Sequence, residues 1–160
     1  MTHLRPRRAI LLLPAAIALA ACARTPASPD PGNRRLHALA ADPVFAVLSP
    51  GAVRTSWRED PAKYRNEGPF GPQTWDGPDV IMTFTSARSV RDVYDFYAER
   101  ARGAGWTPWS KLTEGFTDIW VRDIAGHKSF IQLLPKDFDN HSVDVTESGI
   151  PRSYSLTGST

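Results

Sequence analysis

The segment from residue 79 to residue 106 constrains the fold more than any other part of this 160-residue chain. Residues 79–86 (DVIMTFTS) are β-branched and aromatic with alternating character, which predicts a strand. Ser89 is a suitable N-cap for a helix over 89–103, and Gly103 and Gly105 supply its C-terminal stop. The apolar side chains of this helix recur at i, i+3, i+4 and i+7, namely Val90, Val93, Tyr94, Tyr97, Ala98, Ala101 and Ala104. A helix with one apolar face beside a strand must bury that face against a sheet.

Further strands are predicted at 106–111, 117–124, 128–134 and 142–148. Folding 117–124 onto 128–134 about a three-residue loop, 125–127, places Ile119 opposite Leu133 and Val121 opposite Ile131. The pattern indicates an α+β fold, with an antiparallel sheet of four to five strands and one long amphipathic helix packed on one face. The expected order is β-α-β-β-β.

The flanking segments give weaker signals. A short helix is expected at 34–41, and AVRTSWRE (52–59) alternates like a strand. Residues 59–78 hold four Pro and three Gly, so we expect an irregular loop there. The polar tail 153–160 is expected to fray, which leaves a single domain over 36–152.

The first 21 residues have the organisation of a secretory signal peptide. Arg5, Arg7 and Arg8 form a basic start, the apolar or small run 9–21 follows, and small residues precede the expected cleavage point. A transmembrane helix is the alternative, but it needs about 20 apolar residues, and this run is shorter and contains Pro14.

The sequence Leu19-Ala20-Ala21-Cys22 resembles the lipobox of bacterial lipoproteins, and Cys22 is the only cysteine. The resemblance implies cleavage before Cys22, a diacylglyceryl group on its sulfur, and anchoring to the outer face of the cell membrane. In a cell with two membranes the outer membrane is an alternative. Export by the general or by the twin-arginine route is left open, as is the oligomeric state.

Removal of the leader changes the charge balance of the chain. The full sequence has 19 Lys and Arg against 17 Asp and Glu, and the leader holds three Arg and no acid, so 16 basic residues face 17 acidic ones afterwards. A net charge of −1 gives no support for nucleic-acid binding, which needs a clustered basic face. Residues 22–35 hold the lipidated Cys and a Pro-rich stretch without large apolar side chains, and we interpret them as an extended tether.

A second resemblance covers about 75 residues. The run DVIMTFTSARSVRDVYDFYAERARGAGW is similar to the strand–helix–Gly-Trp segment of small bacterial lipoproteins of unknown function, which continues into a β-meander. Tyr97, Ala101, Gly105 and Trp106 hold the corresponding places, with Ala101 where Leu is usual. The resemblance implies a location and a fold type, and it carries no catalytic residues.

No catalytic residue, metal site or cofactor is expected. The sequence has neither Gly-x-Ser-x-Gly nor Ser-x-x-Lys, and its Gly126-His127-Lys128-Ser129 run lacks the glycine of a phosphate loop. The acidic run 137–144 has no EF-hand spacing and is more typical of turns.

Five tryptophans raise the alternative of sugar binding: Trp57, Trp75, Trp106, Trp109 and Trp120. Trp106 and Trp120 are expected in the core, and Trp75 with Phe70 in the 59–78 loop is the best candidate for a glycan or peptide site. Our leading expectation is a non-enzymatic lipoprotein domain of the cell envelope that binds a protein or the cell wall. A ligand-binding module using 59–78, or a hydrolase with a dispersed site, are the alternatives.

Overall fold

The computed structural model describes residues 26–30, 33–68, 71, 73–111, 117–136, 148–149 and 151–160. Within them the chain forms three helices and eight strands. In chain order these are α1 (Arg34–Ala40), α2 (Pro43–Ala46), β1 (Val53–Asp60), β2 (Lys63–Asn66), β3 (Gln73–Asp76), β4 (Asp79–Ser86), α3 (Val90–Gly103), β5 (Thr107–Lys111), β6 (Thr117–Ile124), β7 (His127–Pro135) and β8 (Arg152–Ser159).

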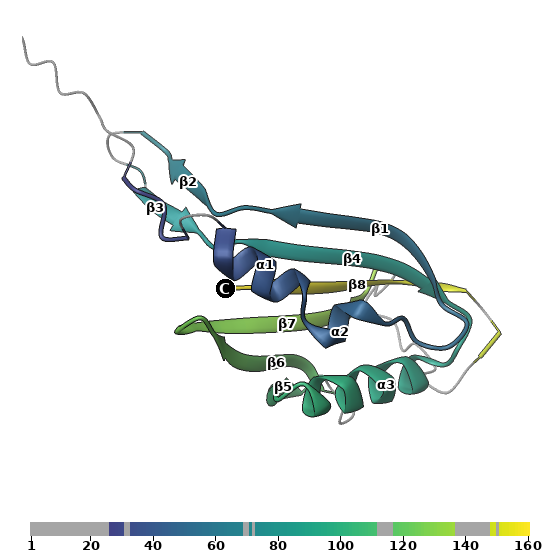
Figure 1. Cartoon of the computed structure of the whole chain (residues 1–160). Helices are drawn as coiled ribbons and strands as arrows, with labels where there is room; N and C mark the ends of the chain where they lie inside the picture. The colour runs from purple at the N-terminus through teal and green to yellow at the C-terminus, as the bar shows by residue number, and fades with distance from the viewer. Residues whose placement is uncertain are drawn as a thin grey trace, which may run out of the picture.

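Six strands form one antiparallel sheet in the order β1-β4-β8-β7-β6-β5, and β2 and β3 form a separate hairpin. The helices lie on one face of the large sheet (Figure 1). The expected α+β class with an antiparallel sheet and a helix on one face is confirmed. The sheet has six strands rather than four or five, and α1 and α2 accompany the long helix.

The prediction that residues 153–160 fray is wrong. Residues 153–159 belong to β8, which pairs with β4 on one side and β7 on the other. Tyr154 stacks on Phe84 with ring centroids 5.2 Å apart, and Leu156 is fully buried. The stacked and buried side chains hold the segment inside the sheet, although most of its residues are Ser, Thr or Gly.

Helix α3 matches its prediction closely. The Ser89 hydroxyl accepts a hydrogen bond from the Asp92 amide at 3.1 Å, which is the expected N-cap. Tyr94 and Tyr97, which belong to the apolar stripe of this helix, are buried. The Tyr97 ring packs against the sheet with its centroid 5.5 Å from that of Phe84.

Helices α1 and α2 close on the sheet at Gly158. A Cβ built at this position would lie 2.8 Å from Phe45 Cζ and 3.0 Å from Leu39 Cδ1. A residue without a side chain is therefore needed where Phe45 of α2 and Leu39 of α1 descend onto β8. The expected helix at 34–41 is confirmed as α1.

The hairpin of β6 and β7 exists, but its expected register is off by one residue. Trp120 pairs with Ile131 and Val121 with Phe130, because the turn has two residues rather than three. Ala125 and Gly126 have φ values of 50° and 81°, the positive pair that a tight two-residue hairpin turn requires. The slip reverses the two faces of β6, so that Trp120 enters the core and Ile119 and Val121 point to the other side.

Other expectations on the strands have mixed outcomes. The strands at 79–86, 106–111 and 117–124 are confirmed, and the expected one at 142–148 lies almost wholly outside the described residues. The folded unit begins upstream of the expected start at residue 36. Asp30 is 3% exposed, and its carboxylate accepts hydrogen bonds from the amides of Arg35 at 3.0 Å and Leu36 at 3.3 Å.

A buried polar cluster ties the helical layer to β6. The Asp42 carboxylate caps α2 by accepting from the Val44 amide at 2.9 Å, and it accepts from Trp106 Nε1 at 3.1 Å. Its Oδ2 lies 2.5 Å from Arg122 Nη2, and Arg122 also donates to the Ala104 carbonyl at the end of α3. Each hydrogen-bonding group named in this cluster has a partner within it, which indicates a structural role.

Candidate functional site

The large sheet has one face without a helix among the described residues, and we call it the open face (Figure 1). Alternation along the strands and the observed registers place on it Ile81, Thr83 and Thr85 of β4, Ser153, Ser155 and Thr157 of β8, Phe130, Gln132 and Leu134 of β7, Ile119 and Val121 of β6, and Trp109 of β5. One row crosses four strands as Ile81, Thr157, Gln132 and Ile119.

Hydroxyl groups cluster on the β1–β4 side of this face. The register between β1 and β4 shifts between Arg54 and Ser56, so that Thr55 and Ser56 both reach Thr83. The Thr83 hydroxyl lies 2.9 Å from that of Thr55 and 2.5 Å from that of Ser56. Because hydroxyls both donate and accept, this cluster can match amide, carbonyl or sugar groups.

Aromatic side chains lie on the same open face but toward its other edge, on β5 and β7. Trp109 of edge strand β5 is 57% exposed and makes an edge contact with Phe130, their centroids 6.1 Å apart. The Lys128 ammonium stands 3.9 Å from the centre of the Trp109 ring. Leu134, four residues beyond Phe130 along β7, is 39% exposed. The open face therefore offers an aromatic platform with the Lys128 ammonium over the Trp109 ring, and a hydroxyl-rich surface on the same face.

The predicted ligand site at Trp75 has a different setting from the one expected. Residues 63–76 include the β2–β3 hairpin, so the prediction that 59–78 is irregular is wrong. Trp75 pairs with Tyr64 across the hairpin, their ring centroids 5.4 Å apart, and it is only partly exposed. Tyr64 thus occupies part of the indole surface. Phe70 and Cys22 lie outside the described residues.

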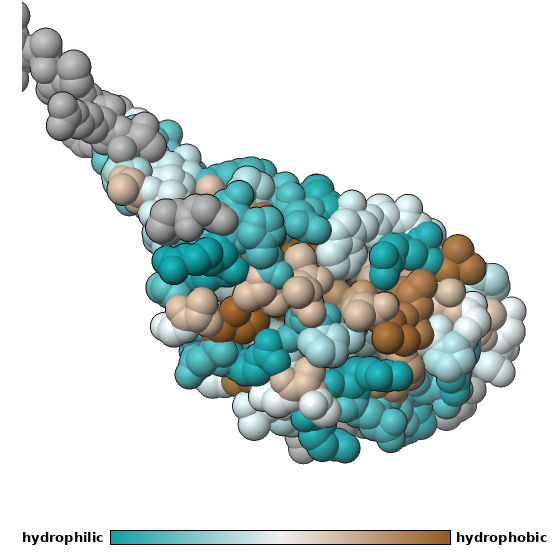
Figure 2. All heavy atoms as spheres, in the orientation of Figure 1, coloured by the Kyte–Doolittle hydropathy of each residue, from teal (hydrophilic) through white to brown (hydrophobic). Residues whose placement is uncertain are grey.

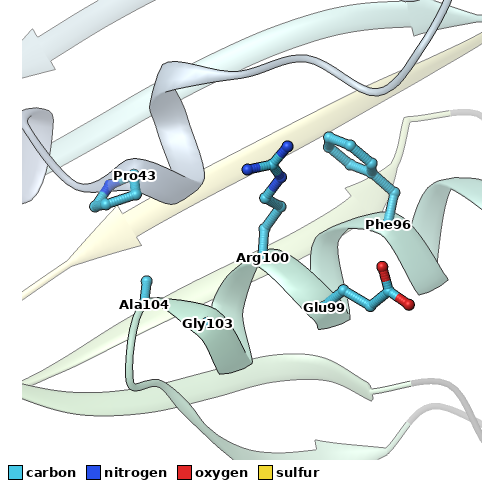
Figure 3. A pocket seen from close by; sticks show the side chains of 6 residues that line it. All are labelled: Pro43, Phe96, Glu99, Arg100, Gly103 and Ala104. Carbon is cyan, nitrogen blue, oxygen red and sulfur yellow. The ribbon is translucent and has the colours of Figure 1, made fainter.

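A groove of about 420 Å³ runs between α2 and α3 (Figure 3). Pro43, Phe96, Gly103 and Ala104 give it apolar walls. The Arg100 guanidinium lies over the Phe96 ring at 5.3 Å and points toward α2, whereas Glu99 points away from it. These two charged groups do not converge, so the groove lacks the paired acid and base that proton-transfer chemistry uses.

Acidic residues meet at one end of the sheet, where Asp60 of β1 pairs directly with Asp79 of β4. The pKa of Asp79 is raised by burial, and further by the charges of Asp60 and Asp76. Arg58 and Lys63 neutralise Asp60 at 2.6 and 3.3 Å. Within the part of the chain that the structure describes, no three His, Cys, Asp or Glu side chains form a group that could hold a metal ion.

The core tryptophans were placed correctly from the sequence, since Trp106 is 2% and Trp120 1% exposed. Sequence reasoning preferred Trp75 to Trp109 as the exposed aromatic. The available signal for Trp109 was its neighbour Pro108, because proline in a strand favours an edge position.

Comparison with known protein families, with curated proteins and with solved structures gave no match. None of the described helices has the length and apolar character needed to cross a bilayer.

Proposed function

We propose that this chain is a lipid-anchored lipoprotein of the cell envelope whose domain binds another envelope protein through the open face. The proposal joins two independent features. The Leu19–Cys22 sequence supports the anchor, and the chemistry of the open face supports the partner.

The observation that carries the binding role is the apolar content of the open face. An antiparallel sheet packed on one side normally shows polar residues to water on the other. Here Trp109 is exposed on the open face, and Phe130, Ile119 and Val121 on the same face are partly exposed. Figure 2 shows the helix-bearing side, where apolar patches are interspersed among hydrophilic residues. Exposed apolar surface rimmed by polar groups is typical of protein interaction sites, where Trp is also enriched.

The anchor is tested by membrane fractionation of the full-length protein and its Cys22→Ala variant with labelled fatty acid. We expect the wild type in the membrane fraction with label incorporated, and the variant without label and released from the membrane. Equal fractionation and labelling of the two proteins would contradict lipid anchoring.

The binding surface is tested by a photo-crosslinking amino acid placed at Gln132 on the open face, at Trp109 on its aromatic side, or at exposed Arg102 on α3. Lipidated protein is irradiated in whole cells, and adducts are separated by size. A discrete protein adduct from Gln132 and Trp109 but not from Arg102 is expected. The same adducts from all three positions, or none from the open face, would contradict the proposal.

Glycan binding is the second candidate, and the exposed indole of Trp109 favours it. An indole face stacks on sugar rings while neighbouring hydroxyls and the Gln132 amide offer hydrogen bonds. Cell-wall glycan pulled down by the wild type and not by Trp109→Ala would support this alternative. Trp75→Ala serves as the comparison, because the sequence predicts the ligand site in the 59–78 segment. A hydrolytic role has no comparable support among the described side chains.

A further inference from the structure

The described N-terminal residues, 26–30, meet the domain at one end of the large sheet. At this end β1 finishes at Asp60, β4 starts at Asp79, β8 finishes at Ser159, and the β6–β7 turn lies at Ala125 and Gly126. Pro29 and Asp30 line a cavity of about 140 Å³ together with Ala125 and His127 of that turn. The incoming chain is therefore seated against this end, which we call the tether end.

Asp30 holds the incoming chain firmly in place. Its buried carboxylate accepts from the Arg35 amide at 3.0 and 3.2 Å and from the Leu36 amide at 3.3 Å. The Arg35 side chain, 7% exposed, lies 3.8 Å from the same carboxylate. Eight peptide steps separate Cys22 from Asp30. Even fully extended, they span no more than about 29 Å, so a lipid on Cys22 would keep the tether end close to the bilayer.

The β2–β3 hairpin leaves the domain from the same end. It follows Asp60 and precedes Asp79, and its two strands pair with each other rather than with the large sheet. Figure 1 shows it extending beyond the body of the domain. A two-stranded hairpin is marginal by itself in water, so its composition indicates what it contacts.

The hairpin combines an aromatic pair with balanced charges. Tyr64 and Trp75 face each other across the strands and are both partly exposed. Arg65 pairs with Asp76 at 2.6 Å and with Glu67 at 3.5 Å. Tyr and Trp are the residues that membrane-bound proteins concentrate at the level of the lipid headgroups. Paired charges mean that this contact would not depend on anionic lipid.

We propose that the β2–β3 hairpin is a second membrane contact, with Tyr64 and Trp75 seated in the headgroup region of the bilayer to which Cys22 is anchored. This inference rests on the proposed lipid anchor. It makes the hairpin an orienting device, because two points of attachment at one end hold the strands of the large sheet upright from the membrane. The open face then stands clear of the lipid along its whole length.

The test uses the full-length lipidated protein in phosphatidylcholine vesicles whose acyl chains are brominated, so that tryptophan close to the lipid is quenched. Wild type, Trp75→Phe and Trp109→Phe are compared after co-sedimentation with the vesicles. We expect quenching in the wild type and in Trp109→Phe, and its loss in Trp75→Phe.

A second probe tests the same contact without replacing Trp75, so a folding defect of that variant does not affect it. An environment-sensitive fluorophore is attached at Thr74→Cys on β3, or at Val53→Cys, which lies at the far end of β1 and is 63% exposed. The first should shift to the blue on vesicles and the second should not.

The outcomes separate the anchor from the hairpin contact. A wild type that fails to co-sediment would overturn the anchor and, with it, this inference. Co-sedimentation with equal quenching in Trp75→Phe and wild type, or equal fluorophore shifts at positions 74 and 53, would overturn the hairpin contact alone.

Discussion

The Asp42 carboxylate and the Arg122 guanidinium lie 2.5 Å apart, although 80 residues separate them in the chain. The Asp42 side chain is fully buried, whereas that of Arg122 is 28% exposed. Arg122 also lies over the Trp106 ring at 4.7 Å. One carboxylate thus connects the start of α2, the end of α3 and strand β6.

We expect Asp42→Ala to lower the free energy of unfolding by about 2–4 kcal/mol, because the buried Val44 and Trp106 donors lose their acceptor and the partly buried Arg122 loses its counter-charge. Urea unfolding at neutral pH measures the loss. The matched control is Arg58→Ala, which breaks an exposed ion pair with Asp60 and should cost no more than about 1 kcal/mol. Equal losses in the two variants would contradict a structural role for the Asp42 cluster.

Gly158→Ala should destabilise the domain by about 1–3 kcal/mol, since a new methyl group in a packed core forces its neighbours to move. Its Cβ would meet Phe45 at 2.8 Å. Ser159→Ala, one position further along β8, changes the opposite side of the strand and should stay within about 0.5 kcal/mol of the wild type. An unchanged midpoint for Gly158→Ala would mean that β8 does not lie under α1 and α2.

Asp79→Asn should stabilise the domain at neutral pH. The pKa of Asp79 is raised, so the native state holds its proton at pH values where the unfolded chain has released it. Ionisation of Asp79 therefore costs stability as the pH rises through its raised pKa, and the cost persists above it. The gain from the substitution should shrink as the pH falls toward 3.8, the ordinary value for the group. Unfolding curves between pH 3 and pH 8 test this, with exposed Asp123→Asn as control; a gain that does not depend on pH would contradict the assignment.

Two buried tyrosines should respond differently to loss of the hydroxyl. The Tyr94 hydroxyl donates to the Leu133 carbonyl at 2.9 Å, so Tyr94→Phe should cost about 1 kcal/mol. The Tyr154 hydroxyl is buried without a hydrogen-bond partner among the described residues, so Tyr154→Phe should be neutral or stabilising. Thermal unfolding of the two variants measures the difference, and a larger loss for Tyr154→Phe would reverse the argument.

Burial also raises the pKa of Tyr94, Tyr97 and Tyr154 above the ordinary value of 10.0. The native state keeps these protons where the unfolded chain loses them, so stability should fall as the pH rises above 10. Absorbance of tyrosinate near 295 nm should therefore be lower in the native protein than in urea at the same alkaline pH. Identical titration curves in the two states would show that these side chains are accessible.

The sequence predicted those elements whose signal lies within one continuous segment. Strand β4 and helix α3 each carry a complete periodicity and, for the helix, its own cap at Ser89. Strand β8 has only Tyr154 and Leu156 as large core side chains, with Ser and Thr between them. Its place depends on partners far away in the chain, which a local pattern does not contain.

The predictions of the β6–β7 register and of the exposed aromatic residue were wrong for a related reason. Apolar residues occur on both faces of β6, so alternation was compatible with either register, and the two-residue turn at Ala125 and Gly126 decided between them. Trp75 is the better candidate by sequence because it lies in a Pro- and Gly-rich segment, which carries no local signal of a partner for the indole. Tyr64 is such a partner, and it becomes visible only once β2 and β3 pair.

The central position of β8 has a consequence for how this protein is made. Without residues 152–159, β4 and β7 have no strand between them, and the sheet is left as two parts that each lack a hydrogen-bonded neighbour. A chain emerging from the ribosome or threading through an export channel cannot complete its core until that strand is free. The order of synthesis thus delays folding until the end of the domain has been delivered. Such a delay would suit the passage across a membrane that the proposed lipid anchor requires.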